Sequence, residues 1–242
     1  MKVLGDGGYS IRDGLEIDGE GASVFVFGRG WLLEVVDIES GDYYFLSDGK
    51  KVRPAGRHFG VFYPPFSMVR PAVRSVRGKV VGVGSVRPPV GLPDHPVLFE
   101  TDRRDEFTDV AEAADVFASA RGVSSIEMNT QPSTLSIRCK NLIDENYLAE
   151  PGIARIAARL GVSHEHMTRQ FRRDFGMAPS AYLHQLRVAE ATFRLSLGEE
   201  IIDISGEVGY NDLSRFYKQF KKKTATSPAQ CRLMFDDAEA RA

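Results

Sequence analysis

The sequence predicts an α+β fold: a small β-barrel or sandwich at the N-terminus, followed by an all-α domain of seven helices. Residues 1–101 hold short apolar bursts separated by glycine and proline turns. From Ile153 to Arg232, a helix, a glycine turn and a basic helix occur twice in succession. With 242 residues, 43% of them hydrophobic, the chain is long enough to fill two cores.

The β-rich domain is predicted over residues 1–101. Its apolar bursts lie at residues 24–27, 31–33, 43–46, 59–66 and 80–81. Turn signals such as Ser47-Asp48-Gly49 separate these bursts. Many short strands joined by tight turns are typical of a sandwich or a small barrel.

A helix is expected between the two domains, from about Arg104 to Ala120. Apolar residues at i, i+3, i+7 and i+10 form one face of it: Phe107, Val110, Ala114 and Phe117. That face either packs against its own barrel or forms a dimer interface, and both alternatives stay open. Residues 102–132 are expected to hold this helix and a linker, before the helical domain at 133–235 and an acidic tail at 236–242.

The repeat in the last third of the chain contains one pattern twice. Three residues of the first copy, Ile156, Gly161 and Phe171, recur as Ile204, Gly209 and Phe220. The offset is 48 residues before the turn and 49 after it, so the second copy has one extra residue in its turn. Each copy reads as a helix-turn-helix, and two of them in one chain indicate double-stranded DNA as the partner.

The turns and caps of both copies follow from their residue types. Gly161 and Gly209 supply the left-handed backbone that a helix needs where it ends in a sharp turn. Ser163 is expected to cap the second helix of the first copy, and Asn211 or Asp212 that of the second.

Positive charge is concentrated in the repeat. Residues 151–235 carry 13 Lys/Arg against 8 Asp/Glu, a net charge of +5, whereas the whole chain has −2. Such a concentration suits a surface that contacts phosphate. A single basic residue fits a solvated helix face equally well, but both copies have a basic pair after the same phenylalanine, at Arg172-Arg173 and Lys221-Lys222.

Motifs in the repeat match a known family. In chain order they are Ile156-Ala157-x3-Gly161-Val162-Ser163, Phe171-Arg172-Arg173-x2-Gly176, Pro179-x2-Tyr182-Leu183 with Arg187 and Ala191, Val208-Gly209-Tyr210, Phe216-x3-Phe220-Lys221-Lys222 and Ser227-Pro228-x3-Arg232. On these motifs, the C-terminal domain resembles the DNA-binding domain of the AraC/XylS family of bacterial transcription regulators. The resemblance implies two recognition helices in successive major grooves.

The resemblance also implies roles for residues of the two recognition helices. The expected base readers are Glu165, Thr168 and Arg169 in the first unit and Leu213, Ser214, Tyr217 and Lys218 in the second. Phosphate contacts are expected from Arg172, Arg173, Asn211, Arg215, Lys221 and Lys222, and Ser163, His164 and Asp212 complete the DNA-binding set. Ser205, Ala225 and Cys231 depart from the family pattern, and Ala225 stands where glycine is usual.

For the N-terminal domain, the resemblance implies a cupin-like barrel that senses a ligand or forms a dimer. Its aromatic and basic residues suggest an effector pocket lined by Trp31, Tyr43, Phe45, Arg57, His58 and Tyr63. The simpler alternative is that these aromatics are the core of the barrel. His58 has no second histidine in a His-x-His pair, so we expect no metal, no cofactor and no catalytic residues.

The two cysteines, Cys139 and Cys231, lie far apart and outside any CxxC motif. Neither a disulfide framework nor a zinc site is expected, and a reducing cytoplasm fits. We find no apolar run that suggests a signal peptide or a membrane span. The expected location is the bacterial cytoplasm, with no membrane partner.

The sequence therefore predicts a sequence-specific DNA-binding regulator of transcription that is not an enzyme. Control by an effector, a partner protein or homodimer formation stays open, as do contact with RNA polymerase and the choice between activator and repressor. One alternative is a cupin-type enzyme that binds a small molecule and carries a vestigial DNA module. Another is an adaptor regulated by a partner protein.

Overall fold

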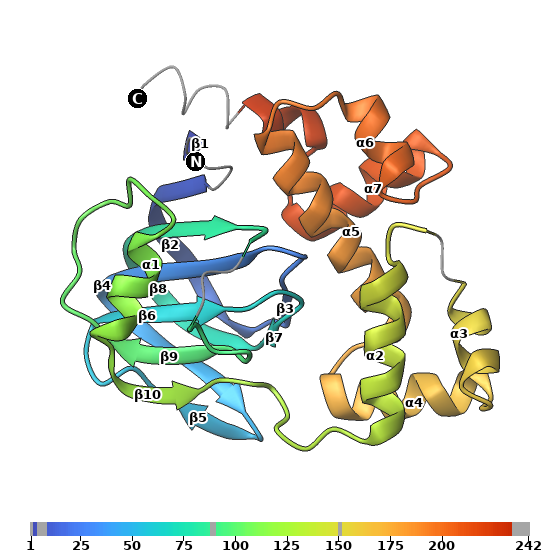
Figure 1. The fold of residues 1–242 in the computed structure, drawn as a ribbon, viewed down its shortest axis with the longest axis horizontal. Helices are drawn as coiled ribbons and strands as arrows, with labels where there is room; N and C mark the ends of the chain where they lie inside the picture. Colours follow the sequence, from blue (N-terminus) through green and yellow to red (C-terminus); the bar gives the residue numbers. More distant parts are fainter. Residues whose placement is uncertain (1, 4–8, 88–90, 150–151, 234–242) are drawn as a thin grey trace. The chain divides into compact units, whose positions relative to one another are not determined.

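The computed structural model describes residues 2–3, 9–87, 91–149 and 152–233. The chain forms two compact units, Met1–Thr130 and Gln131–Ala242. The first consists mainly of strands and the second of helices (Figure 1). The acidic tail predicted at 236–242 lies outside the described residues.

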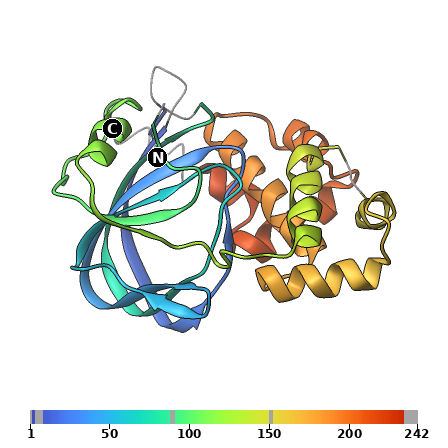
Figure 2. The ribbon, with the colours of Figure 1, turned by 60° about the horizontal axis from the view of Figure 1, so that its bottom comes forward.

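An antiparallel sheet of eight strands forms most of the first unit. The strands of this unit are β1 (Lys2–Val3), β2 (Tyr9–Ala22), β3 (Phe25–Val26), β4 (Trp31–Ser47), β5 (Lys50–Val52), β6 (His58–Tyr63), β7 (Met68–Val69), β8 (Pro71–Ser85), β9 (Val97–Glu100) and β10 (Arg121–Ser125). The order is β1-β2-β8-β4-β6-β9-β10 with β5 beside β4, while β3 and β7 pair separately. Figure 2 shows how strongly the long strands curve.

The curvature has a local cause in the long strands. The pairing register between β4 and β8 shifts twice, between Ile38 and Ser40 and between Ser40 and Asp42. Gly41 lies within the second shift at φ 93°, and a Cβ atom there would collide with the backbone of Arg74 and Ser75. The extra residues at such bulges bend and twist a strand, which lets the sheet wrap around its own core.

Both faces of the sheet are buried against apolar side chains. Trp31 and Val35 of β4 pack on one face with Phe107 and with α1 (Glu112–Ala118). Val36 of the same strand packs on the other face with Phe59 of β6. Because successive strand residues point to opposite faces, one strand supplies two separate clusters.

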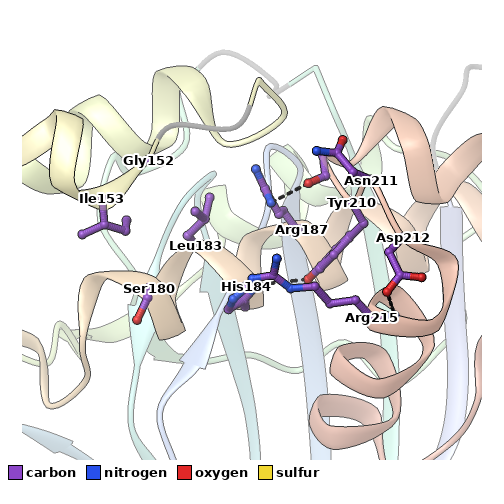
Figure 3. Close-up of a pocket in the computed structure, with 11 residues that line it drawn as sticks. Gly152, Ile153, Ser180, Leu183, His184, Arg187, Tyr210, Asn211, Asp212 and Arg215 are labelled. Atoms are coloured by element: carbon purple, nitrogen blue, oxygen red, sulfur yellow. Dashed lines mark hydrogen bonds between the residues drawn. The ribbon is translucent and has the colours of Figure 1, made fainter.

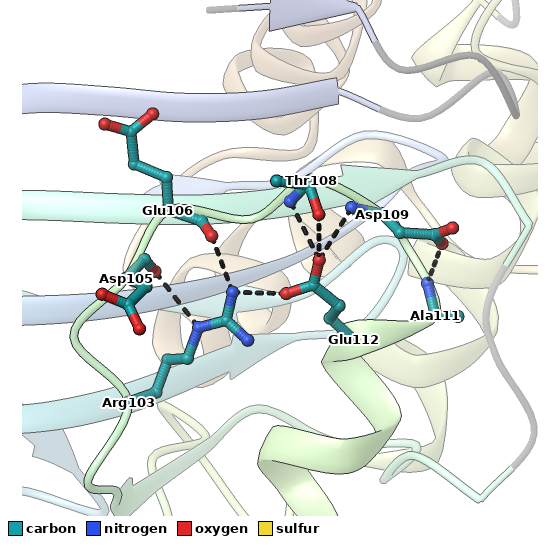
Figure 4. A network of polar contacts seen from close by, with 7 residues as sticks. All are labelled: Arg103, Asp105, Glu106, Thr108, Asp109, Ala111 and Glu112. Atoms are coloured by element: carbon teal, nitrogen blue, oxygen red, sulfur yellow. Dashed lines mark hydrogen bonds and ion pairs between the residues drawn. The ribbon is translucent and has the colours of Figure 1, made fainter.

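The helix predicted from Arg104 to Ala120 is shorter than expected, because α1 begins only at Glu112. The residues before it form a loop held by the Glu112 carboxylate (Figure 4), which accepts hydrogen bonds from the backbone N–H groups of Thr108 at 3.0 Å and Asp109 at 3.1 Å. Arg103 pairs with the same carboxylate and donates to the Glu106 carbonyl at 2.6 Å. These side-chain contacts satisfy backbone groups that a longer helix would have paired internally.

The structure places the apolar face of the predicted helix and part of the predicted linker within the sheet unit. Phe107 is 3% exposed and lies in the sheet core, so this face packs on its own unit, as the simpler alternative predicted. Residues expected in the linker form β10, which pairs with β9. Ile126, directly after it, is fully buried in the other cluster.

The second unit contains the predicted helical domain. Its helices are α2 (Thr134–Asn146), α3 (Ile153–Arg159), α4 (His164–Phe175), α5 (Pro179–Ser196), α6 (Ile201–Glu207) and α7 (Leu213–Thr224). A seventh helical segment covers residues 228–233 of the described chain. The α+β fold class with seven helices in this unit is thus confirmed.

Candidate nucleic-acid interface

The two sequence repeats fold into two helix-turn-helix units with matching parts. In each, a helix of 7 residues (α3 or α6) is followed by one of 12 residues (α4 or α7). Residues 160–163 join the first pair and 208–212 the second. The second connection is longer by one residue, as the change of offset from 48 to 49 predicted.

Both short helices end in the same hydrogen-bonded turn. After α3, the N–H of Gly161 donates to the Ala158 carbonyl at 3.0 Å, and that of Val162 to Ala157 at 3.1 Å. After α6, the corresponding donors are Gly209 at 3.1 Å and Tyr210 at 3.0 Å. This pair of bonds defines a Schellman motif, which needs a left-handed residue. The φ angles of Gly161 and Gly209 are 71° and 79°, as predicted.

Each long helix begins with a side-chain cap. Ser163 accepts a hydrogen bond from the His166 N–H at 3.2 Å, as predicted. Of the two candidates in the second unit, Asp212 is the cap: its carboxylate accepts from Ser214 N–H at 2.9 Å and Arg215 N–H at 3.3 Å. These caps satisfy N–H groups that have no partner within the helix.

The inner faces of α4 and α7 hold the units together. Phe171 of α4 is fully buried, with its ring centroid 4.8 Å from that of Phe175 and 5.8 Å from that of Tyr182. Phe216 and Phe220 are equally buried under α7, 5.7 Å apart. The outer faces are thereby fixed toward solvent at helical spacing.

Of the expected DNA-binding residues, all but two have exposed side chains. The exposed ones are Ser163, His164, Glu165, Arg169, Arg172, Arg173, Asn211, Asp212, Leu213, Ser214, Arg215, Lys218, Lys221 and Lys222. Thr168 is half-buried, and its hydroxyl oxygen is enclosed with no hydrogen-bond partner among the described residues. Tyr217 is also half-buried, with its ring edge-on to Phe216. These two side chains therefore serve the packing of their helices as well as their outer faces.

Seven basic side chains cover the outer faces of α4 and α7: Arg169, Arg172, Arg173, Arg215, Lys218, Lys221 and Lys222. In the part of the chain that the structure describes, none of the seven takes part in an ion pair. By contrast, Arg194 on α5 pairs with Glu190 at 2.9 Å. The charge on the two long helices is therefore available to an anionic partner.

The structure divides the aromatic residues of the predicted effector pocket between the two clusters of the sheet unit. Trp31 belongs to one cluster of the sheet, whereas Phe45 and Tyr63 belong to the other. Arg57 is exposed and donates to the Glu39 carbonyl at 3.0 Å, and the Nε2 atom of His58 lies 2.7 Å from the Arg103 carbonyl oxygen. Strand alternation and bulges send these aromatic residues to different faces of the sheet.

Glu34 is a polar residue inside the sheet unit that the sequence did not reveal. It lies on β4 near two of the predicted pocket residues, Tyr43 and Tyr63. Burial raises the pKa of Glu34 to about 7, although a hydrogen bond with Tyr63 opposes the rise. In the sequence, Glu34 could have been noticed only as an acidic residue within an apolar strand.

Two features are absent from residues 2–3, 9–87, 91–149 and 152–233. In these ranges no helix is both long and apolar enough to cross a membrane. Nor do His, Cys, Asp and Glu side chains gather there in a group of three or more that could hold a metal ion. Cys139 and Cys231 are buried free thiols.

Comparison with known proteins places the repeat in a described domain type. A family model for a helix-turn-helix domain matches residues 156–234. The HTH-type transcriptional activator RhaS of Pectobacterium carotovorum subsp. carotovorum is 31% identical over 91 residues, which are 37% of this chain and 33% of RhaS. The lactose operon transcription activator of Staphylococcus xylosus is 29% identical over 96 residues, 39% of this chain and 34% of that protein. The chain thus matches about a third of each relative's length.

One solved structure resembles both units. The crystal structure of ToxT from Vibrio cholerae O395 aligns with 95% of this chain and 98% of its own, with a TM-score of 0.54 and 13% identity. At this identity the likeness concerns the fold: an N-terminal β domain followed by a helical domain.

Proposed function

We propose that this protein is a sequence-specific DNA-binding regulator of transcription of the AraC/XylS type, because residues 156–234 match a helix-turn-helix domain that it shares with transcriptional activators. The observation that carries the proposal is the pair of matched units, each presenting a capped helix with an exposed basic face. A helix of this kind fits the major groove of B-DNA. Acting on DNA in a bacterium, the protein would work in the cytoplasm.

We assign different roles to the two ends of each long helix. The first halves, with Glu165 and Arg169 on α4 and with Ser214 and Lys218 on α7, meet base edges. The last turns, with Arg172-Arg173 and Lys221-Lys222, contact phosphates. These basic residues also stabilise the negative end of the helix dipole, so they have a structural reason to be there as well.

The two units are proposed to read different bases. Their inner residues repeat, as Phe171 and Phe220 do, because both copies build the same scaffold. Their outer residues differ: with the offset of 49, Glu165 corresponds to Ser214, and Arg169 corresponds to another basic residue, Lys218. One protein molecule should therefore bind an asymmetric site with two half-sites about one duplex turn, roughly 34 Å, apart.

The sheet unit is proposed to control this activity. The shared fold with ToxT is the support for a two-part regulator. Because Phe107 is buried in its own unit, control by homodimer formation would need a surface other than the predicted helix face. A small-molecule effector, a partner protein and RNA polymerase stay as candidate partners.

Measured affinities for a selected operator and for random duplex would test the assigned roles. Arg169→Ala should lose about 1–3 kcal/mol on the operator, concentrated at one base pair, because a base contact is specific. Lys221→Ala should weaken binding to both duplexes by the same factor and reduce the salt slope by about 1. Arg138→Ala, an exposed arginine on α2, is the matched control. Equal losses for Arg169→Ala on operator and random DNA would contradict the assignment.

A further inference from the structure

A cavity of about 330 Å³ opens in the second unit where its two helix-turn-helix motifs meet (Figure 3). The start of α3 lines it on one side, at Gly152 and Ile153. The connecting helix α5 contributes Ser180, Leu183, His184 and Arg187, and the second motif contributes Gly209, Tyr210, Asn211, Asp212 and Arg215. The lining of the cavity therefore comes from both motifs and from the helix that connects them.

The polar wall of the cavity is fixed before any ligand arrives. Arg187 is 5% exposed, and its guanidinium donates to the Tyr147 carbonyl at 2.8 Å and to the Gly209 carbonyl at 2.7 Å. It also lies over the Tyr210 ring, 5.5 Å from the centroid. His184 stacks on the same ring from α5, with Nδ1 3.2 Å from the Tyr210 hydroxyl. Figure 3 shows these groups and Arg215 gathered around Tyr210.

The electrostatic character of the cavity is positive. Among the described residues of the lining, Asp212 is the only acidic one, and its two carboxylate oxygens accept N–H bonds at the start of α7. Burial, together with the nearby charges of Arg187 and Arg215, lowers the pKa of His184 to about 4. Ser180 adds an exposed hydroxyl in the first turn of α5, near the positive end of this helix of 18 residues.

We propose that this cavity binds a phosphate group, supplied by the DNA backbone between the two major grooves. The positive charges of Arg187 and Arg215, beside the exposed hydroxyl of Ser180, suit a phosphate group. A protein with one helix in each of two successive major grooves passes over the backbone between them, where contacts fix its register. Binding of a DNA phosphate in this cavity rests on the proposed function, whereas the affinity of the cavity for free phosphate does not.

Ser180→Asp is the most selective perturbation. It puts a negative charge in the cavity, while an aspartate in the first turn favours the helix, so folding is retained. The repeat offers a matched control: Ala229 follows Pro228 as Ser180 follows Pro179, is exposed, and lies outside the cavity lining. Ala229→Asp changes the net charge by the same amount.

The first measurement is duplex binding against salt concentration with the full chain. Losing one phosphate contact should reduce the salt slope by about 0.9 and the affinity by about 10-fold at 0.1 M salt. Ser180→Asp should show this loss on operator and on random duplex, and Ala229→Asp should not. The backbone phosphates can also be replaced one at a time by neutral methylphosphonates. One replacement between the half-sites should lower the affinity of the wild type for the duplex but leave that of Ser180→Asp unchanged.

The second measurement needs no DNA. Inorganic phosphate is added while the ring signals of His184 are followed by NMR, and the His184→Gln variant identifies these signals. Bound phosphate should raise the pKa of His184, because an anion favours the imidazolium. A response to free phosphate without any methylphosphonate effect would support a phosphate site but contradict DNA as its source. If duplex is not bound at all, the proposed function fails while this titration still tests the site. Unchanged His184 signals together with an unchanged Ser180→Asp salt slope would overturn the proposal.

Discussion

The two turn glycines should respond unequally to alanine, although their backbones are alike. Gly161 and Gly209 have φ angles of 71° and 79°. An alanine in this left-handed region costs roughly 1–2 kcal/mol for backbone reasons alone. A Cβ atom at Gly161 would meet nothing within 4 Å, so Gly161→Ala should cost no more than this.

At Gly209 the same Cβ atom would lie 2.6 Å from Nη2 of Arg187 and 3.0 Å from the Leu148 carbonyl oxygen. Arg187 cannot withdraw without breaking its bonds to Tyr147 and to Gly209 itself, at 2.8 and 2.7 Å. A hydrogen bond to a charged group contributes about 1.5–3 kcal/mol, so Gly209→Ala should cost about 3–5 kcal/mol in total.

Urea unfolding of both variants, followed by circular dichroism, would measure this difference. Gly198→Ala is the matched control in the same unit, because Gly198 has φ 79° and no atom within 4 Å of a Cβ. The control should resemble Gly161→Ala. If Gly209→Ala lowered the free energy of unfolding by the same amount as the other two, the inferred role of Arg187 in closing this turn would be wrong.

Three other substitutions test local physics by urea unfolding. Ala225 follows α7 at φ 63°, in the position that Gly176 takes after α4 at φ 70°. Ala225→Gly should therefore raise the free energy of unfolding by about 0.5–1 kcal/mol, and a decrease would show that the alanine backbone is not strained. A hydrogen bond from Thr108 lowers the pKa of Glu112 to about 2. Glu112→Gln should therefore lower the free energy of unfolding by about 1–2 kcal/mol at pH 7, and its difference from the wild type should shrink as pH falls from 4.5 toward 2. Glu34, with its raised pKa of about 7, should behave in the opposite way. Glu34→Gln should raise the free energy of unfolding by about 1–3 kcal/mol at pH 8 and by less at pH 5. A constant difference across pH would contradict either assignment.

The parts of the fold that depend on local pattern could be predicted from the sequence. The glycine positions and the extra residue in the second turn are visible in the repeat, because a turn of this kind requires a left-handed residue at one place. The cap at Ser163 follows from residue type as well. Between Asn211 and Asp212, residue type does not decide, because both can cap; the backbone geometry selects Asp212.

The parts of the fold that depend on strand register, or on side chains that bind backbone groups in place of a helix, could not be predicted from the sequence. The first half of the predicted helix before Glu112 is a loop because one carboxylate binds the backbone of Thr108 and Asp109. Trp31 and Tyr63 belong to opposite faces of the sheet, which only the strand register decides. The cavity between the motifs combines residues that lie far apart in the chain, such as Ile153 and Arg215.

The most direct test of two-groove reading is the affinity of the full chain for a selected operator whose half-sites have been moved apart. Inserting about 5 base pairs, half a turn of B-DNA, puts the two half-sites on opposite faces of the duplex. Two units joined by the single helix α5 (Pro179–Ser196) cannot follow this change. Affinity should therefore fall to the level of an operator that contains one half-site alone. Unchanged affinity would show that one unit suffices and would contradict the account.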